Sequence, residues 1–237
     1  MDAAETLTAQ RRERLAANVT HVRGRMAEAA RRSGREPEAV QLITVTKSAS
    51  LAEAQAAVEL GCTVLGENRV QVAAEKVPHI DGDVTWHLIG HLQRNKARKA
   101  LELVETIQSV DSERLAATLE RIAGDMGREN VPILVEVNMS GEAQKHGVAP
   151  EGLEPLLAAV VGFPRLTLRG LMTMAPHTDD KGALRRCFVE LRELRERLAE
   201  RGYPLPELSM GMTNDYEIAI EEGATLVRIG SALFATT

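Results

Sequence analysis

Eight apolar, β-rich segments recur along this chain, and helical segments separate them. The segment 131–139, VPILVEVNM, is apolar over nearly its whole length, as expected for a strand that is covered on both faces. A strand-then-helix repeat predicts parallel strands joined by right-handed crossovers, and eight repeats favour an α/β fold with a closed (β/α)8 TIM barrel over an open sheet. The expected strands are 41–47, 62–68, 85–90, 106–111, 131–139, 166–174, 207–211 and 224–230.

Helix start and stop signals lie between the expected strands. Ser50-Leu-Ala-Glu53 has the pattern of a capping box, and Gly61 ends the helix that follows it. The segment from Asn214 to Glu217 is expected to cap a short helix that ends at Gly223.

A further helix is expected ahead of the barrel. Residues 5–33 carry apolar positions at three- and four-residue spacing, which is typical of an amphipathic helix. At 237 residues and 44% hydrophobic, the chain can bury a full core, and barrels of this size form one domain. We predict a single domain with the leading helix in 1–38 and the barrel in 39–237.

Composition limits the expected partners. The net charge of −5 argues against nucleic acid, and 3% aromatic residues suit base stacking poorly. Cys62 and Cys187 stand far apart with no CxxC or His-rich companion, so neither a disulfide framework nor a metal site is predicted. No apolar run approaches the roughly 20 residues of a membrane span, and the first residues lack a signal peptide's apolar stretch. We expect a cytoplasmic monomer with no nucleic-acid and no membrane partner.

Lys47 closes the first expected strand, QLITVTK. In barrels of this type the functional groups lie at the C-terminal ends of the strands. A lysine at such a position can simply extend its ammonium to water along an apolar stem. In the alternative interpretation, its neutral amine is a nucleophile for an aldehyde.

The segments after the last two strands predict a phosphate site. Gly211-Met212-Thr213 leads into a helix N-terminus, where free N–H groups and the helix dipole favour an anion. Gly230 lets a phosphate approach the backbone, and the Ser231 hydroxyl can donate to it. The alternative is that the glycines only shape loops. Closure of the barrel brings Lys47 to this rim, and the combination indicates a phosphate cofactor bound to a lysine.

Two further polar residues lie at or near the ends of expected strands. Arg228 precedes Gly230 by two residues, so its side chain lies on the same side of the strand. An arginine inside a barrel is costly unless it is paired or ligand-bound. Asn68 follows the second strand and is either a helix N-cap or a site residue. The roles of His87, His91 and Lys96 are left open, although His87 in an apolar run is more typical of a satisfied core histidine.

Taken together, six segments resemble the pyridoxal phosphate homeostasis protein family, which consists of single-domain barrels related to the N-terminal half of alanine racemase. The resemblance covers nearly the whole chain and implies a fold-type III barrel with pyridoxal 5′-phosphate as cofactor. The segments are VTKS around Lys47, GENRVQ at 66–71, WHLIGHLQRNK at 86–96, VEVNMSGEAQKHGV at 135–148, LRGLMTM at 168–174 and LSMGMTNDYEIAIEEGATLVRIGSALF at 208–234.

The resemblance also implies a role for individual residues. Lys47 resembles the Schiff-base lysine, Arg228 the arginine that faces the pyridine nitrogen, and Asn68 the pocket asparagine. Two positions depart from the family pattern, because Arg69 stands where many members have tyrosine and Ala224 replaces a small hydroxyl residue. The implied phosphate-binding set is Ser209, Met212, Thr213, Gly230 and Ser231, beside Gly211.

Catalysis is a separate question from cofactor binding. A racemase needs two bases on opposite faces of the substrate carbon. In the related racemases a tyrosine from the partner subunit is the second base, whereas here the tyrosines are Tyr203 and Tyr216 and neither ends an expected strand. We predict a non-catalytic protein that holds pyridoxal phosphate and delivers it to apo-enzymes in intracellular cofactor homeostasis. One alternative is a racemase-like enzyme that uses the cofactor. A second alternative is a Schiff-base aldolase, which is less favoured because aldolases of this kind typically carry their lysine on a late strand.

Overall fold

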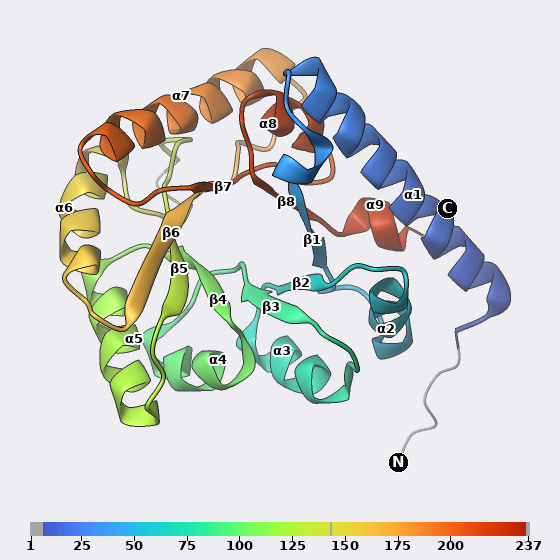
Figure 1. The fold of residues 1–237 in the computed structure, drawn as a ribbon, viewed down its shortest axis with the longest axis horizontal. Coiled ribbons are helices and arrows are strands. Elements are labelled where there is room, and N and C mark those ends of the chain that lie inside the picture. Colours follow the sequence, from blue (N-terminus) through green and yellow to red (C-terminus); the bar gives the residue numbers. More distant parts are fainter. Residues whose placement is uncertain (1–6, 143, 236–237) are drawn as a thin grey trace.

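The computed structural model describes residues 7–142 and 144–235. Its strands form a closed parallel barrel in the order β1 to β8, surrounded by a ring of helices (Figure 1). This confirms the predicted (β/α)8 barrel. The strands are β1 Gln41–Val45, β2 Val64–Glu67, β3 Thr85–Leu88, β4 Thr106–Val110, β5 Val131–Glu136, β6 Leu166–Met172, β7 Glu207–Ser209 and β8 Leu226–Ile229.

The helices follow the predicted start and stop signals. Ser50 and Glu53 form the expected capping box of the first helix after β1. The α-helices are α1 Ala9–Arg32, α2 Leu51–Glu59, α3 Val70–Lys76, α4 Ala97–Leu103, α5 Glu113–Met126, α6 Pro150–Val161, α7 Lys181–Glu200, α8 Tyr216–Glu221 and α9 Ser231–Phe234. Short 3₁₀ helices lie at Pro37–Ala39, Val77–His79 and Arg94–Lys96.

The predicted leading helix is confirmed as α1, which lies along the outside of the barrel beside α2, α8 and α9 (Figure 1). Its buried stripe includes Leu15, Val19, Val22 and Met26 at three- and four-residue spacing. These residues join the large core between strands and helices. In the part of the chain that the structure describes, no helix combines the length and the apolarity needed to cross a membrane.

Pairing of the first and last strands brings the two ends of the sequence together. Ile43 is opposite Arg228 and Thr44 is opposite Ile229. Just beyond this ladder, a Cβ added to Gly230 would lie 2.8 Å from the Val45 carbonyl oxygen. A side chain at position 230 would therefore push on the strand that carries Lys47.

Every strand is one to three residues shorter than predicted. The fifth strand ends at Glu136 rather than at 139, because the chain turns back and the Val148 N–H donates to the Glu136 carbonyl at 2.8 Å. The short helix after β7 has Asp215, a residue of the predicted capping segment 214–217, at its N-cap position. The Asp215 Oδ1 accepts from the Met212 N–H at 2.5 Å, so this carboxylate closes the turn before the helix.

Candidate functional site

A chain of hydrogen bonds crosses the inside of the barrel from β8 to β3. Arg228 is 4% exposed, and its guanidinium donates to the Ser209 hydroxyl at 2.7 Å and to the Thr173 carbonyl at 2.8 Å. The Ser209 hydroxyl donates in turn to Gln108 Oε1 at 2.6 Å, and the Gln108 amide nitrogen lies 2.8 Å from His87 Nδ1. Hydrogen bonds from a buried cation fix its position, because leaving any of them unmade is costly.

Burial sets the charge states of the two ends of this chain. It lowers the pKa of Arg228 to about 10, an effect that Glu136 and Asp215 oppose, so the guanidinium stays charged at neutral pH. It also lowers the pKa of His87 to about 4, so this imidazole is neutral there. The structure shows His87 as a buried residue that is hydrogen-bonded to Gln108.

Ser209 does not lie with the other residues of the predicted phosphate set. It is fully buried, and its hydroxyl is engaged by Arg228 and by Gln108. Ser209 is the last residue of β7, before the turn that holds Gly211 and Thr213. Side chains along a barrel strand alternate between inside and outside, and the hydrogen bonds of Ser209 to Arg228 and Gln108 place it inside. Ser209 therefore helps to position Arg228 by accepting a hydrogen bond from its guanidinium.

Two hydroxyls meet on the turns after β7 and β8. The exposed Ser231 donates to Thr213 Oγ1 at 2.9 Å. Gly211 reaches the required turn with φ +95°, and a Cβ there would lie 2.6 Å from the Ala219 Cβ. Among the described residues, the N–H groups of Thr213 and Asn214 donate to no protein acceptor. The Met212 N–H is already taken by Asp215, so Met212 offers this rim its side chain, which is partly exposed.

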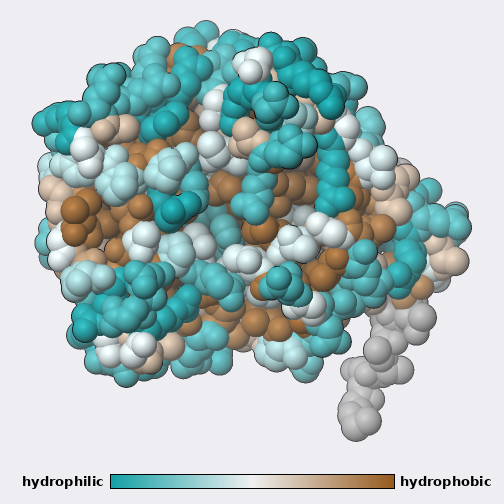
Figure 2. Space-filling view, in the orientation of Figure 1, coloured by the Kyte–Doolittle hydropathy of each residue, from teal (hydrophilic) through white to brown (hydrophobic). Residues whose placement is uncertain are grey.

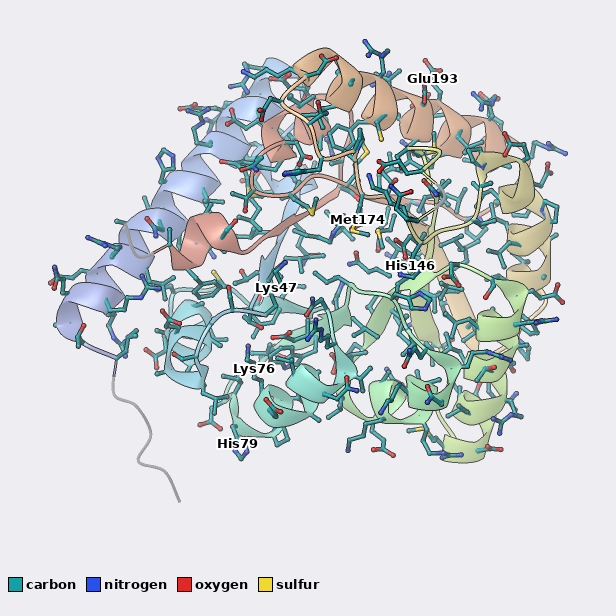
Figure 3. The ribbon with its side chains drawn as sticks, turned by 180° about the vertical axis from the view of Figure 1, so that it is seen from behind. Lys47, Lys76, His79, His146, Met174 and Glu193 are labelled. Carbon is teal, nitrogen blue, oxygen red and sulfur yellow. The ribbon has the colours of Figure 1, made fainter. Side chains whose placement is uncertain are left out.

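Lys47 lies two residues beyond β1 and is exposed. Figure 3 shows it toward the middle of the barrel, together with Met174 and His146. The residue before it, Thr46, is fully buried. Lys47 therefore combines a fixed backbone with an accessible amine.

A buried ion pair fixes that backbone, and sequence reasoning missed it. Lys76 Nζ contacts the Thr46 carbonyl oxygen and lies 3.0 Å from Glu67 Oε1, which also accepts from the Thr46 hydroxyl at 2.6 Å. Glu67 is 0% exposed and Lys76 is 7% exposed. The one available signal was a glutamate ending an apolar strand, since a buried carboxylate requires a partner.

Asn68 is half-buried at the end of β2, and Arg69 rather than Asn68 holds the N-cap position of α3. The N-cap interpretation of Asn68 is therefore wrong. A Cβ added to Gly90 would lie 2.2 Å from the Asn68 carbonyl oxygen, so the chain after β3 contacts the backbone of Asn68 directly. The Ser109 hydroxyl donates to the Gly90 carbonyl at 2.7 Å and extends this contact to β4.

Glu136, at the end of β5, is a second acid that sequence reasoning missed. It is 2% exposed. Burial, together with the nearby charge of Asp111, raises its pKa to about 7, although Arg228 acts in the opposite direction. Near neutral pH this side chain is therefore divided between its protonated and ionised forms.

Replacing Glu136 by glutamine is expected to stabilise the protein at alkaline pH. Because the folded-state pKa is raised, the contribution of Glu136 to stability is present below its ordinary pKa of 4.5 and is lost as the pH rises through about 7. The difference in unfolding free energy between variant and wild type should grow across this window by about 3 kcal/mol, from about 1.4 kcal/mol per pH unit. Urea denaturation at a series of pH values measures it.

The titration of His87 does not disturb this comparison of unfolding free energies. Its lowered pKa has the opposite sign, so its contribution is present above 6.5 and is lost as the pH falls through about 4. Both proteins carry His87, and the difference curve cancels it. A difference in unfolding free energy that stays constant between pH 4.5 and 8 would show that burial does not raise the pKa of Glu136.

Neither tyrosine lies at this rim as a free acid or base. Tyr216 is the first residue of α8 and is buried, which raises the pKa of its phenol. Tyr203 comes before β7, at the opposite end of the strand from Gly211. The chemical groups at the rim are instead an accessible amine, a hydroxyl pair with free N–H groups, and a fixed interior cation.

A parallel barrel with this set of groups belongs to the class of the alanine racemase N-terminal domain, and the sequence matches the family described as "Alanine racemase, N-terminal domain" over residues 12–237. The solved alanine racemase of Clostridium difficile 630 shares the fold, with a TM-score of 0.70 at 16% identity, over 84% of this chain and 52% of that chain.

Relatives at higher identity are more specific. The chain is 41% identical to the pyridoxal phosphate homeostasis protein of Pseudomonas aeruginosa over 93% of this chain and 94% of that protein. It is 39% identical to the protein of the same name from Aquifex aeolicus, over 91% and 95%. PipY of Synechococcus elongatus PCC7942, solved with PLP bound, has a TM-score of 0.82 at 35% identity and covers 93% of this chain and 100% of that chain. The chain belongs to the pyridoxal phosphate homeostasis protein family.

Proposed function

We propose that this protein binds pyridoxal 5′-phosphate, with Lys47 as the covalent attachment point. The observation that carries the proposal is the β1–β8 pairing, which places the end of β1, two residues before Lys47, against Gly230. Gly230 precedes Ser231, which forms the hydroxyl pair with Thr213. PipY, a relative covered over its whole length, is a structure with PLP bound. The same cofactor accounts for the amine and for the anion-binding groups on one rim.

The residues present fit the cofactor's phosphate. A phosphate needs several donors, and the rim offers two hydroxyls beside the N–H groups of Thr213 and Asn214. The absence of a side chain at Gly230 leaves the backbone open to close approach. The proposed phosphate set is Gly211, Met212, Thr213, Gly230 and Ser231, with Ser209 acting through Arg228.

The rest of the site would hold the ring and the aldehyde. Bound pyridoxal phosphate supplies an aldehyde that can capture amines. Lys47 supplies the amine, and Asn68 lies beside it at the end of β2. Arg228, whose charge is permanent at neutral pH, would face the ring nitrogen and disfavour its protonation.

We further propose that the protein is a non-catalytic carrier in the cytoplasm, acting as a single-domain monomer. The name of its curated relatives, homeostasis protein, supports this role. So does the position of the tyrosines, since a racemase requires a second base and Tyr216 is buried while Tyr203 is at the far end of β7. Apo-enzymes that need the cofactor would be its recipients.

The carrier role predicts delivery without turnover. Cofactor-loaded protein incubated with L-alanine should give no D-alanine and no pyruvate above the level of free cofactor. Mixed with an unrelated apo-enzyme that uses pyridoxal phosphate, it should restore activity, at a rate set by release from Lys47. Rapid racemisation with no restored activity would establish the racemase-like alternative.

Removing the hydroxyl of Ser231 or Thr213 is expected to weaken pyridoxal phosphate selectively. A hydrogen bond to a charged group is worth about 1.5–3 kcal/mol, which corresponds to roughly ten- to a hundredfold in affinity. Ser231→Ala and Thr213→Val are titrated with pyridoxal phosphate and with unphosphorylated pyridoxal. Equal losses for the two ligands would mean that the substitutions disturb packing and not phosphate binding.

A further inference from the structure

Three side chains with metal-binding groups meet at the rim, outside the residues assigned to the cofactor. His91, Asp111 and His146 each offer one ligand atom, and these atoms all lie within 4.8 Å of one another. They come from the segments after β3, β4 and β5. Because the three residues belong to different loops, no sequence spacing predicts that they lie together. We propose that His91, Asp111 and His146 form a binding site for a divalent transition-metal cation such as Zn²⁺.

The geometry between the first two residues already suits a metal. His91 Nδ1 lies 3.3 Å from Asp111 Oδ2. Two ligands on one tetrahedral zinc are about 3.3 Å apart, since metal–nitrogen and metal–oxygen bonds are about 2.0–2.2 Å. The other carboxylate oxygen, Asp111 Oδ1, accepts from the Ser112 hydroxyl at 3.1 Å, and such outer hydrogen bonds hold a ligand in orientation.

A backbone turn positions His146, the third ligand. Gly147 has φ +107°, and a Cβ there would lie 2.7 Å from the Asn138 nitrogen, so the glycine lets the chain fold back tightly onto the end of β5. The Val148 N–H completes the return by donating to the Glu136 carbonyl. His146, one residue before the glycine, is thereby held against His91, with ring centroids 3.9 Å apart and an interplanar angle of 9°.

The stacked arrangement must open slightly to bind an ion. An imidazole nitrogen binds a metal through a lone pair that lies in the plane of the ring. Two parallel, stacked rings therefore cannot both coordinate one cation. Both histidines are exposed, and rotation about their side-chain bonds loses a ring stack but disturbs no core packing. With three protein ligands, the ion would keep an open position for water.

The surrounding charges favour a cation. Glu136 interacts electrostatically with Asp111, which adds a second acid to the neighbourhood. The nearest lysine on the same loop, Lys145, is paired with Glu142 at 2.6 Å. Carboxylate and imidazole ligands together suit zinc, and also iron and cobalt, better than calcium or magnesium.

Equilibrium dialysis of the full chain, freed of pyridoxal phosphate, against Zn²⁺ tests the site. Wild type should bind one ion per chain, and His146→Gln and Asp111→Asn should each weaken binding by at least about tenfold, the smallest loss usual for perturbing a metal's surroundings. His79→Gln is the matched control, since His79 is exposed on the outer ring of helices and labelled there in Figure 3. It should bind like wild type.

A second measurement separates a specific site from surface binding. Co²⁺ in place of Zn²⁺ should give visible absorption bands in wild type and in His79→Gln, with the bands lost in His146→Gln. The thermal unfolding of each variant is measured beforehand without metal, and the substitutions of the exposed His146 and His79 should leave the transition unchanged. Equal affinity in all four proteins, or bands that persist without His146, would overturn the proposal. The cofactor is not needed for this test, so its outcome is independent of pyridoxal phosphate binding.

Discussion

Lys47→Ala is expected to eliminate the covalent capture of pyridoxal phosphate at this site. In the wild type, borohydride treatment should fix the cofactor to a single peptide, the one that contains Lys47, because this amine is exposed just beyond β1, the strand that pairs with β8. The variant should lose that label together with the visible absorbance of the bound cofactor. It should retain only binding through the phosphate set, which Ser231→Ala would then weaken further.

Lys47→Arg is the matched control for the charge at this position. Arginine keeps a cation at the end of β1, but its guanidinium stays protonated and is not a nucleophile. It should therefore fail to be labelled, like alanine. Wild-type label found on Lys96 or Lys145 instead of Lys47 would contradict the assignment of the site.

The barrel itself was predictable because it depends on patterns that are local in sequence. Eight alternations of strand and helix, a capping box at Ser50 and the apolar stripe of α1 are each visible in a short window. The approach of the end of β1 to Gly230 follows from them, since closure of the barrel pairs the first strand with the last strand as well as with the second. Figure 2 shows one face of the molecule, on which hydrophobic patches lie among hydrophilic residues.

The interior polar contacts could not be predicted in the same way. The resemblance to the family implies Ser209 as one of the phosphate-binding residues. Whether its hydroxyl faces the rim or Arg228 depends on Gln108, which is 101 positions away. The His91, Asp111 and His146 cluster has the same origin, since three loops supply it. Contacts between distant residues appear only when the barrel sets its register.

The buried pair beneath Lys47 also arises from such a contact, and breaking it should have the largest effect on stability. Lys76→Met removes the cation from Glu67, which is fully buried and has a second oxygen, Oε2, without a hydrogen-bond partner among the described residues. Removing one partner of a buried ion pair costs about 3–5 kcal/mol, because the remaining charge is left in a low-dielectric interior. Urea denaturation at pH 7.5 measures the loss.

Two further variants identify the cause of that loss. Lys99→Met is the matched control, because Lys99 forms an exposed pair with Glu102 and such pairs contribute about 0–1 kcal/mol. The double variant Lys76→Met with Glu67→Gln should be more stable than Lys76→Met alone, since the amide keeps an acceptor for the Thr46 hydroxyl without a buried charge. If Lys76→Met were no more destabilising than Lys99→Met, the buried ion pair would contribute no more to stability than an exposed pair.

The same variants report on function. Lys76 holds the carbonyl of Thr46, the residue that precedes Lys47, so its loss frees the backbone from which the reactive amine projects. We expect Lys76→Met to slow the capture of pyridoxal phosphate at Lys47 even under conditions where the variant is fully folded, because a less fixed amine spends less time in the reactive position. Unchanged capture kinetics in a folded Lys76→Met protein would confine this ion pair to a role in stability.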